Sequence, residues 1–597
     1  MTTNAVYILT AEAKDLYNSN NLCYENPSGY GIRQKEGNIN TRKFINTLDY
    51  SLDLIKLREI YEKIYRRHDF SFKSGNKEYT RHVINVKFTY AQKVFNKVGG
   101  SIYVRNGYQY RDIELKDHIC VKDNILIAIE VDKDVENPYS NLSVLDKYFI
   151  YEDGQYKSTS QNNTILTKAE LRQYLYKHGF MCDGIKYVRW KRSSGSSRVG
   201  KCLFINEALY SRIHKWETCN LKINHGDSID LAAFEAYIAL TASSIIDTLE
   251  IKPENFLVIS DYTSVFKDTV MGVEYENNEL VSKVNEYEIS NSIFDGESLM
   301  EENLVPEKYK SHSMLLLRNR FFKSAAFKCK IQKWFEDNDI TDISQLNGFT
   351  LAKDISDIKI ITTPSSIKYS KFGSIEEWLK LIDPVFGIVK HEKPTHYFDG
   401  RKVSCHYQLI NTLQLSKKEV ETLLQPSLDY IMQVRNDPDI LRHHIKYPYE
   451  ERQQVVPLHN KNEIVFKLLG INYNFSKTKL YYEFRDSLVK AMIRELKQGH
   501  VLINGNYSTL LGNGIEMLQH SIGTFNGESI LGKGNIYSKR FEFGKTLLAS
   551  RSPHICSGNI VLSQNVHNDL IETYFDLSNE VVYINAIGEN IQQRCNG

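Results

Sequence analysis

Apolar side chains recur at helical spacing in several long stretches of the chain, with polar side chains between them. This spacing predicts helices over residues 52–64, 230–249, 409–441 and 480–497. A further helix is predicted to begin at residue 168, because Thr167 is a good N-cap and Glu170 completes a capping box three residues later. The helices after residue 409 follow one another closely, so they predict a helical connector.

Short runs of β-branched and other apolar residues predict buried strands. Such runs lie at 124–130, 256–259, 501–505 and 581–584. A chain of 597 residues exceeds what one core usually holds. We therefore expect a multidomain α+β protein with these parts: an N-terminal mixed α/β domain (1–180), a basic hairpin and helix (181–254), a first strand-rich domain (255–395), a helical connector (396–498) and a second strand-rich domain (499–597).

Composition sets weaker limits on function. The 75 basic and 73 acidic residues give a formal net charge of +2, so any contact with nucleic acid must come from local patches. Nine cysteines without a C-x-x-C pair favour a reducing compartment over a disulfide framework. The chain has neither a signal-peptide pattern at its start nor an apolar stretch of about 20 residues. We expect a cytoplasmic protein without a membrane partner.

One local patch is strongly basic. Residues 186–201 contain six basic side chains and no acid, with Tyr187 and Trp190 between them. Such a segment can follow a nucleic-acid backbone. The residues that we predict to bind nucleic acid are Arg189, Arg192, Arg198 and Lys201. A solvated charged turn is the alternative reading of the same segment.

The same segment carries a misleading match to a nucleotide-binding P-loop. Residues 195–202 fit the pattern except that Cys202 stands where Ser or Thr should meet magnesium. The residues that follow, Leu203 to Ile205, predict a strand rather than the helix whose N-terminus would hold phosphates. We therefore reject the P-loop and predict a basic hairpin.

Four short motifs follow one another in an order that resembles a known family. They are Phe294-Asp295-Gly296-Glu297, Arg318 to Lys323, Ile360 to Lys368, and Arg551-Ser552-Pro553. Their order resembles that of the two-barrel RNA polymerases, above all the RNA-dependent polymerases of RNA silencing and single-chain enzymes of phages and mobile elements. The resemblance covers about the C-terminal two-thirds of the chain. It implies two double-psi β-barrels, the second incomplete, joined by a helical connector.

The resemblance also implies roles for three residues. Lys323 and Lys368 match the active-site lysines of the first barrel, and Arg551 matches an arginine that reaches the sugar of the incoming nucleotide. Preorganised cations suit phosphoryl transfer, which spreads negative charge over phosphate oxygens. We expect residues 255–395 to form a six-stranded barrel with both lysines facing one cleft. The alternatives are an amphipathic helix around Lys323 and a paired turn arginine at 551. Arg320 and Phe321 replace two family glycines, so the backbone there is expected to differ.

The family binds Mg²⁺ through a D-x-D-G-D loop, which is absent from these 597 residues. Two magnesium ions need closely spaced oxygen ligands. The resemblance places this loop after Gly597, so we expect the chain alone to be inactive and a downstream polypeptide to supply the aspartates. The aspartate pairs at 132–134, 337–339 and 437–439 predict surface turns instead, and no metal ligand is assigned within the chain.

These patterns lead to a main hypothesis and two alternatives. The main hypothesis is most of a template-directed RNA polymerase, a nucleotidyltransferase whose partners are a nucleic-acid template and nucleoside triphosphates. Whether the template is RNA or DNA stays open. The first alternative is a non-enzymatic nucleic-acid-binding or replication accessory protein of a phage or mobile element. The second is a structural protein of such an element.

Overall fold

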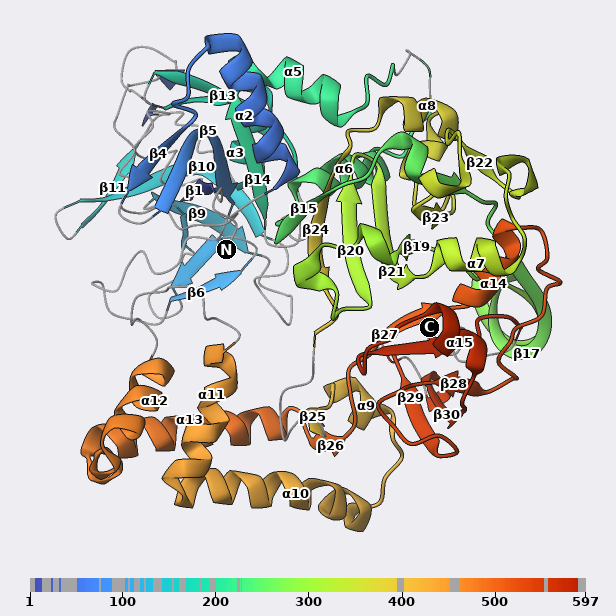
Figure 1. Cartoon of the computed structure of the whole chain (residues 1–597). Coiled ribbons are helices and arrows are strands. Elements are labelled where there is room, and N and C mark those ends of the chain that lie inside the picture. The colour runs from blue at the N-terminus through green and yellow to red at the C-terminus, as the bar shows by residue number, and fades with distance from the viewer. Residues whose placement is uncertain are drawn as a thin grey trace. The chain divides into compact units, whose positions relative to one another are not determined.

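The computed structural model describes most of the chain (Figure 1). The described residues are 6–12, 23–24, 32–33, 51–74, 77–88, 102–105, 108–111, 119–122, 125–131, 142–152, 155–159, 168–182, 184–192, 200–222, 226, 228–276, 278–393, 402–450, 461–551, 554 and 557–588. Contacts between residues divide the chain into two compact units. The N-terminal unit comprises Thr2–Asp247 and Arg318–Phe321, and the C-terminal unit comprises Thr248–Leu317 and Phe322–Gly597.

The N-terminal unit contains a sheet with the strand order β1-β5-β14-β13-β12, and β4 pairs with β5. The strands are β1 (Tyr7–Glu12), β4 (Ser71–Ser74), β5 (Lys77–Lys87), β12 (Phe180–Cys182), β13 (Ile185–Arg189) and β14 (Lys201–Asn206). β13 and β14 pair antiparallel, with Val188 opposite Ile205, as the predicted hairpin requires. The hairpin thus shares a sheet with β1 and β5, although we expected it to lie outside the domain of residues 1–180.

A second sheet of this unit is an antiparallel meander in the order β11-β10-β9-β8-β7-β6. Its strands are β6 (Ile102–Arg105), β7 (Tyr108–Arg111), β8 (Ile119–Lys122), β9 (Ile125–Val131), β10 (Leu142–Glu152) and β11 (Gln155–Thr159). A short pair, β2 (Cys23–Tyr24) and β3 (Ile32–Arg33), is also antiparallel. The buried strand predicted at 124–130 is β9.

The helices of the N-terminal unit are α2 (Leu52–Tyr65), α3 (Lys168–His178), α5 (Glu207–Glu217) and α6 (Leu231–Ile238). Ser51 caps α2 by accepting a hydrogen bond from the Leu54 N–H. The helix predicted over 230–249 is too long: α6 passes into a 3₁₀ turn at Ala239–Ala242, and Asp247–Glu250 is strand β15. β15 pairs with a strand that begins at residue 385, and local periodicity does not reveal so distant a partner.

The C-terminal unit contains an eight-stranded sheet in the order β15-β24-β20-β21-β19-β23-β16-β22. Besides β15, its strands are β16 (Phe256–Val258), β19 (Glu297–Glu301), β20 (Met314–Asn319), β21 (Phe322–Cys329), β22 (Phe349–Thr350), β23 (Ile360–Thr362) and β24 (Val385–His391). The sheet has eight strands rather than the six predicted for residues 255–395: seven lie in that range, including the two-residue β22, and β15 precedes it. A separate hairpin, β17 (Thr263–Glu276) with β18 (Glu279–Ser292), is inserted between β16 and β19.

A five-stranded sheet follows in the order β27-β31-β28-β30-β29. Its strands are β27 (Thr509–Gly512), β28 (Asn535–Tyr537), β29 (Thr546–Ser550), β30 (Ile560–Asn565) and β31 (Val581–Ile584). If these five strands are numbered 1 to 5 in chain order, their order across the sheet from β29 to β27 is 3-4-2-5-1. The strands β20-β21-β19-β23-β16 of the larger sheet run in the same order.

The two sheets also agree in strand direction. In each, the fourth and second strands are parallel, the second and fifth antiparallel, and the fifth and first parallel. The second strand of each follows a glycine of positive φ, Gly296 at +68° and Gly534 at +76°. The carbonyl of each glycine accepts a hydrogen bond from the fourth strand, from Ala325 N–H at 2.9 Å and Gln564 N–H at 3.1 Å. The C-terminal unit is therefore built on one sheet topology used twice.

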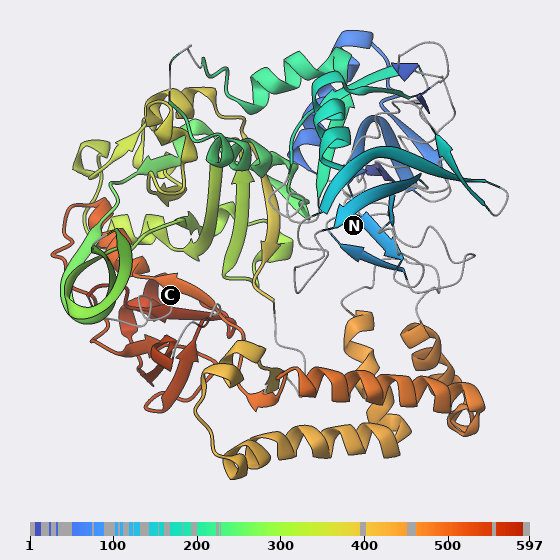
Figure 2. The ribbon, with the colours of Figure 1, turned by 180° about the vertical axis from the view of Figure 1, so that it is seen from behind.

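Along the sequence, helices connect the eight-stranded sheet to the five-stranded sheet. They are α9 (Tyr407–Thr412), α10 (Lys417–Asn436), α11 (Pro438–Glu450), α12 (Lys461–Ile471) and α13 (Lys479–Lys497). α10 begins with a capping box between Ser416 and Glu419, and α10 and α13 lie side by side (Figure 2). A short antiparallel pair, β25 (Lys402–Ser404) with β26 (Leu502–Asn504), joins the two ends of the connector. Within the described part of the chain, no helix is long and apolar enough to cross a membrane.

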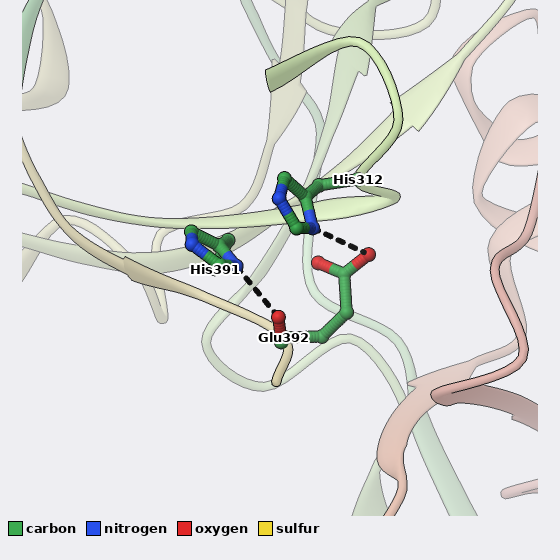
Figure 3. Close-up of side chains that lie close together, drawn as sticks. All are labelled: His312, His391 and Glu392. Atoms are coloured by element: carbon green, nitrogen blue, oxygen red, sulfur yellow. Dashed lines mark hydrogen bonds and ion pairs between the residues drawn. The ribbon is translucent and has the colours of Figure 1, made fainter. Parts of the chain in front are cut away.

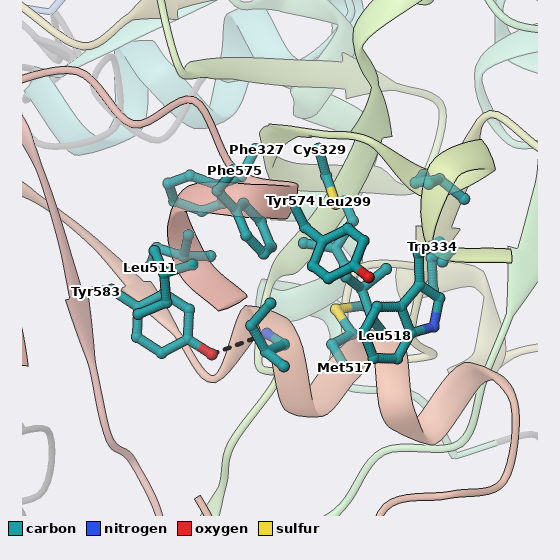
Figure 4. Close-up of a cluster of buried hydrophobic side chains, with 14 of the residues drawn as sticks. Leu299, Phe327, Cys329, Trp334, Leu511, Met517, Leu518, Tyr574, Phe575 and Tyr583 are labelled. Carbon is teal, nitrogen blue, oxygen red and sulfur yellow. Dashed lines mark hydrogen bonds between the residues drawn. The ribbon is translucent and has the colours of Figure 1, made fainter. Parts of the chain in front are cut away.

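Side chains from both sheets of the C-terminal unit fill one core (Figure 4). Among those that are fully buried are Leu299, Phe327, Leu511, Leu518, Phe575 and Tyr583. Trp334 of α7 (Ile331–Asp337) packs edge-on against Tyr574 of α15 (Asp569–Tyr574), with ring centroids 4.9 Å apart. Burial of large side chains in such a core supplies about 1.5–3 kcal/mol each. The two sheets consequently stabilise one another.

A buried carboxyl group links the sheets at one polar point. Glu297, the first residue of β19, is 7% exposed, and its Oε2 accepts a hydrogen bond of 3.0 Å from the N–H of Gly512 at the end of β27. Burial raises the pKa of Glu297 well above its ordinary value, and the nearby Glu516 adds to the rise. Glu297 is therefore protonated over a pH range in which an exposed glutamate is ionised.

We predict that wild type loses stability as pH rises because Glu297 loses its proton, and that the Glu297→Gln variant does not show this loss. In the unfolded chain Glu297 titrates near its ordinary pKa of about 4.3. Between that value and the raised folded pKa, only the folded state binds the proton, so stability falls as pH rises, by up to about 1.4 kcal/mol per unit. Gln keeps the oxygen that accepts from Gly512 and has no proton to lose. The urea midpoint of the variant should rise relative to wild type from pH 5 to pH 8.

The matched control is Glu376→Gln, because the Glu376 side chain is 53% exposed and pairs with Lys380 on the surface. The urea midpoint of this control variant should differ from that of wild type by an amount that does not change with pH. A Glu297→Gln difference that stays constant or shrinks with rising pH would contradict the buried, protonated state.

Candidate active site

Three of the sequence motifs meet at one end of the eight-stranded sheet. The N–H of Gly296 donates to Ser365 Oγ at 3.1 Å, and the carbonyl of Gly296 accepts from Ala325 N–H at 2.9 Å. The N–H of Lys323 donates to the carbonyl of Ser366 at 3.0 Å. The turn at 294–297, the start of β21 and the turn after β23 thus form one hydrogen-bonded cluster, which we call the motif cluster.

Buried hydroxyl groups hold the motif cluster from within. Ser298 Oγ lies 2.7 Å from both Ser324 Oγ and Thr362 Oγ1, and Ser366 Oγ donates to Ser324 Oγ at 3.1 Å. These four residues are 0–1% exposed and come from β19, β21, β23 and the turn that follows β23. A fully satisfied buried network of this kind restricts the cluster to one arrangement.

The two predicted lysines flank an antiparallel bridge between Phe322 and Ile367. Lys323 follows Phe322 on β21 and is exposed, so the alternative of a helix around Lys323 is wrong. Lys368 begins the 3₁₀ turn Lys368–Lys371, is half-buried, and donates from Nζ to the carbonyl of Ser365. The bridge therefore brings the two lysine-bearing segments side by side, and their catalytic role stays a prediction.

The β20–β21 turn takes a glycine-like conformation without glycine. Phe321 has φ of +56°, in the left-handed region that residues other than Gly rarely adopt. Its ring is fully buried and lies 6.3 Å from the ring of Phe234. Arg320 donates to the carbonyl of Trp216 at 2.9 Å. The cost of the left-handed residue, about 1–2 kcal/mol, is offset by these contacts within the N-terminal unit.

Backbone contacts also fix the segment that leaves β31. Ala586 N–H donates to Asn513 Oδ1 at 2.7 Å, and the carbonyl of Ala586 accepts from Asn291 Nδ2 at 3.0 Å. Gly588 N–H donates to Ser264 Oγ at 2.8 Å. Asn291 and Ser264 stand at the base of the β17–β18 hairpin, which thereby holds this segment in place.

Arg551 lies at a different place in the C-terminal unit. It follows β29, is exposed, and lines a cavity of about 580 Å³. The walls of the cavity are mainly apolar side chains of the connector and the five-stranded sheet, and polar groups of His406, Tyr507 and His554 also line it. Arg551 thus directly follows a strand of the second sheet, and its contact with a nucleotide stays a prediction.

One lysine of the basic segment is buried. Lys191 is 1% exposed, and its Nζ lies 2.8 Å from carboxylate oxygens of both Asp53 and Glu217. Burial by itself lowers the pKa of Lys191, but the two carboxylates outweigh it and the pKa is raised. Lys191 therefore fixes α2 and α5 to the sheet of the N-terminal unit and does not reach a ligand.

Two of the arginines that we predict to bind nucleic acid pair with one carboxylate. Arg189 and Arg192 both contact Glu235 of α6, the second at 3.1 Å, and Arg189 also lies over the ring of Tyr176 at 4.8 Å. Lys201 begins β14 and is half-buried. The patch formed by these residues therefore carries less net charge than the sequence of 186–201 indicates.

Several predicted features lie outside the described residues. They are Arg198, the Ser552-Pro553 pair, residues 132–134 and the last segment, 589–597. The other two aspartate pairs have structural roles in the described part of the chain. Asp337 pairs with Lys333 at 2.8 Å, and Asp437 accepts from the Asp439 N–H at 2.8 Å at the start of α11.

Sequence reasoning missed Glu235, Ser264 and Asn291. Glu235 stands in the helix predicted over 230–249, and its one signal was a lone acid in an apolar run. Ser264 and Asn291 are polar residues of ordinary strands, so their contacts with residues 586–588 carry no sequence signal.

Comparison with known proteins places this geometry in context. No family model matches the chain. Over 345 residues the chain is 23% identical to the DNA-directed RNA polymerase YonO of Bacillus phage SPbeta, covering 56% of this chain and 38% of that protein. The structure is similar to that of the RNA dependent RNA polymerase QDE-1 from Thielavia terrestris, with a TM-score of 0.50 and 12% identity. That likeness covers 100% of this chain and 52% of the fungal one.

The chain thus spans about half, or less, of the length of these two polymerases. Two sheets of one topology and a motif cluster in the first agree with the structural likeness. The chain therefore has a fold like that of the fungal RNA dependent RNA polymerase and is similar in sequence to a phage DNA-directed RNA polymerase.

Proposed function

We propose that this chain is part of a template-directed RNA polymerase, in which Lys323 and Lys368 stabilise the negative charge that develops during nucleotidyl transfer. The convergence of Gly296, Lys323 and the 365–368 turn in one hydrogen-bonded cluster is the observation that carries the proposal. An exposed and a half-buried ammonium group on adjacent, rigid segments suit the binding of a triphosphate.

The repeated sheet topology supports a position for the metal site. Lys368 follows β23, the fifth strand of the first five-strand set, and residues 585–588 follow β31, the fifth strand of the second. The two segments are therefore topological equivalents. We propose that the continuation of the second segment carries the aspartates that hold Mg²⁺, and that Ser264 and Asn291 position it through residues 586 and 588.

The magnesium ligands themselves are proposed to come from a polypeptide beyond these 597 residues, which contain no D-x-D-G-D sequence. Bound Mg²⁺ would supply charge neutralisation at the transferring phosphate. The residues of this chain would orient the triphosphate through the two lysines and the nucleotide sugar through Arg551. Arg551 suits that contact because a guanidinium offers several donors in one plane.

The basic hairpin is proposed to contact the nucleic-acid backbone. Arg192 and Arg198 would supply positive charge at the hairpin, and Glu235 would moderate that charge by pairing with Arg189 and Arg192. A hairpin tuned in this way binds phosphates without reading sequence, which suits a polymerase that must accept any template.

We predict that Lys323→Ala and Lys368→Ala each lower Mg²⁺-dependent nucleotide incorporation by about 10²–10³-fold, because each removes a preorganised group that stabilises transition-state charge. The assay uses the chain extended by its continuation, or mixed with a polypeptide that supplies the aspartate loop. Incorporation of labelled nucleotides is measured on single-stranded RNA and single-stranded DNA templates, which also identifies the template.

Lys380→Ala is the control, because Lys380 lies on the surface of α8 (Ile375–Leu381) with its side chain 60% exposed. It should retain full incorporation. Equal activity of wild type and both lysine variants would refute the assignment of the lysines. A complete protein that carries the aspartates and binds nucleic acid, yet incorporates nothing on either template, would favour the accessory-protein hypothesis.

For the hairpin, we predict opposite effects of two variants on nucleic-acid binding. Arg192→Ala with Arg198→Ala should weaken binding to all sequences alike and flatten the salt dependence by about 0.7 per lost contact on single strands. Glu235→Gln should strengthen binding, because it removes the carboxylate that neutralises two guanidinium groups. Fluorescence anisotropy at several salt concentrations measures both effects. An unchanged slope in the double variant would show that the hairpin is only a solvated turn.

A further inference from the structure

Two histidines and a glutamate form a compact cluster away from the motif cluster (Figure 3). His312 precedes β20 by two residues, His391 is the last residue of β24, and Glu392 follows it. One ligand atom from each of the three side chains lies within 4.8 Å of the others. Within the described part of the chain, these residues make up the group whose donor types and spacing match a metal site.

The distance between two of the ligand atoms suits a transition metal. His312 Nδ1 lies 3.7 Å from Glu392 Oε1. Two ligand atoms about 2.1 Å from a zinc ion and this far apart would subtend an angle of roughly 120°, close to the tetrahedral value. Two imidazoles and one carboxylate are also a known zinc ligand set, with a fourth position left for water.

Glu392 is held rigidly in the cluster. It is 4% exposed, and its carboxylate accepts hydrogen bonds from the Ser313 N–H at 2.5 Å, the Met314 N–H at 3.0 Å and the Ser578 hydroxyl at 3.0 Å. These donors come from both sheet regions of the C-terminal unit. Outer contacts of this kind orient a ligating carboxylate and fix its position.

The two rings pack face to face, with centroids 3.7 Å apart and 27° between their planes. His391 Nδ1 lies 2.6 Å from the carbonyl of Glu392. Because imidazole binds a metal in the plane of the ring, the stacked pair must open for both rings to point at one ion. The torsion between Cβ and the ring is broad for histidine, so this rotation is accessible.

A neighbouring lysine does not prevent cation binding. Lys328 contributes positive charge near His312. Its ammonium group pairs with Asp576 at 2.9 Å and donates to the carbonyl of Lys310 at 2.6 Å. The charge of Lys328 is thus offset within the structure, and the carboxylate of Glu392 faces the two histidines.

We propose that His312, His391 and Glu392 bind one divalent transition-metal ion, zinc in particular, and that the ion joins the start of β20, the end of β24 and, through Ser578, the second sheet region. The hard ligands that magnesium prefers are oxygens, so two imidazole nitrogens select zinc over magnesium. The site is independent of the magnesium proposed for catalysis. Zinc would act on the stability of the C-terminal unit, because it binds the folded chain only.

The test measures zinc binding by the 597-residue chain after dialysis against a chelator. Titration against a chromophoric zinc chelator should give one zinc per chain for wild type, and zinc should raise the melting temperature. His312→Gln and His391→Gln should each weaken binding by more than about 100-fold, beyond the 10–100-fold cost of losing only an outer contact. Glu392 is left intact, since its carboxylate also accepts from two backbone amides.

His68→Gln is the matched control, because the His68 side chain is 88% exposed and contacts Glu62 at the surface. It should bind zinc as wild type does. X-ray absorption of zinc-loaded wild type gives a second readout that needs no variant, and it should find two imidazoles bound to the metal. The proposal would be overturned if wild type binds no zinc, or if the His312→Gln, His391→Gln double variant keeps full affinity. A metal shell without imidazole would also overturn it.

Discussion

The common apolar core of the two sheets is the constraint on which the C-terminal unit depends. Each sheet has one face that must be covered, and each covers the other through side chains such as Leu299, Phe327, Leu511 and Tyr583 (Figure 4). Glu297 lies buried beside this core, where burial raises its pKa, and its carboxyl group accepts a hydrogen bond from Gly512, so one polar contact links the two sheets. The loops at the sheet ends inherit their positions from this packing.

The internal repeat gives a physical reason for the position of the proposed catalytic groups. Two copies of one 3-4-2-5-1 topology place equivalent loops at equivalent points of each sheet. The first copy presents Lys368 after its fifth strand, and the second copy presents the segment that Asn513, Asn291 and Ser264 hold by hydrogen bonds. Cations from one copy and carboxylates from the equivalent loop of the other would be complementary, as phosphoryl transfer with metal ions requires.

Local pattern predicted many of the elements well. The helices at 52–64 and 480–497, the strands at 256–259 and 581–584 and the antiparallel hairpin around 186–201 all exist in the structure. Where pattern failed, the cause was a distant partner. Residues 247–250 form a strand because they pair with β24, more than 130 residues later, although their periodicity continues that of a helix.

The closeness of the candidate site segments was predictable from motif order rather than from chemistry. The order of the motifs placed Lys323 and Lys368 near one another, and the bridge between Phe322 and Ile367 agrees with that arrangement. Charge pairing was not predictable, because Glu235 meets Arg189 across 46 residues and Asp53 meets Lys191 across 138. Phe321 shows the same limit: its left-handed backbone is stabilised by burial against Phe234, a contact invisible in the sequence.

The most direct test is a structure of the chain joined to, or mixed with, a polypeptide that supplies the proposed aspartate loop, with Mg²⁺ and a nucleoside triphosphate that cannot react. The account predicts that the ammonium groups of Lys323 and Lys368 both lie within about 4 Å of phosphate oxygens, the distance of an ion pair. We also expect the metal ions to lie beside the aspartates of the added polypeptide. A triphosphate bound elsewhere, with both lysines facing solvent, would contradict it.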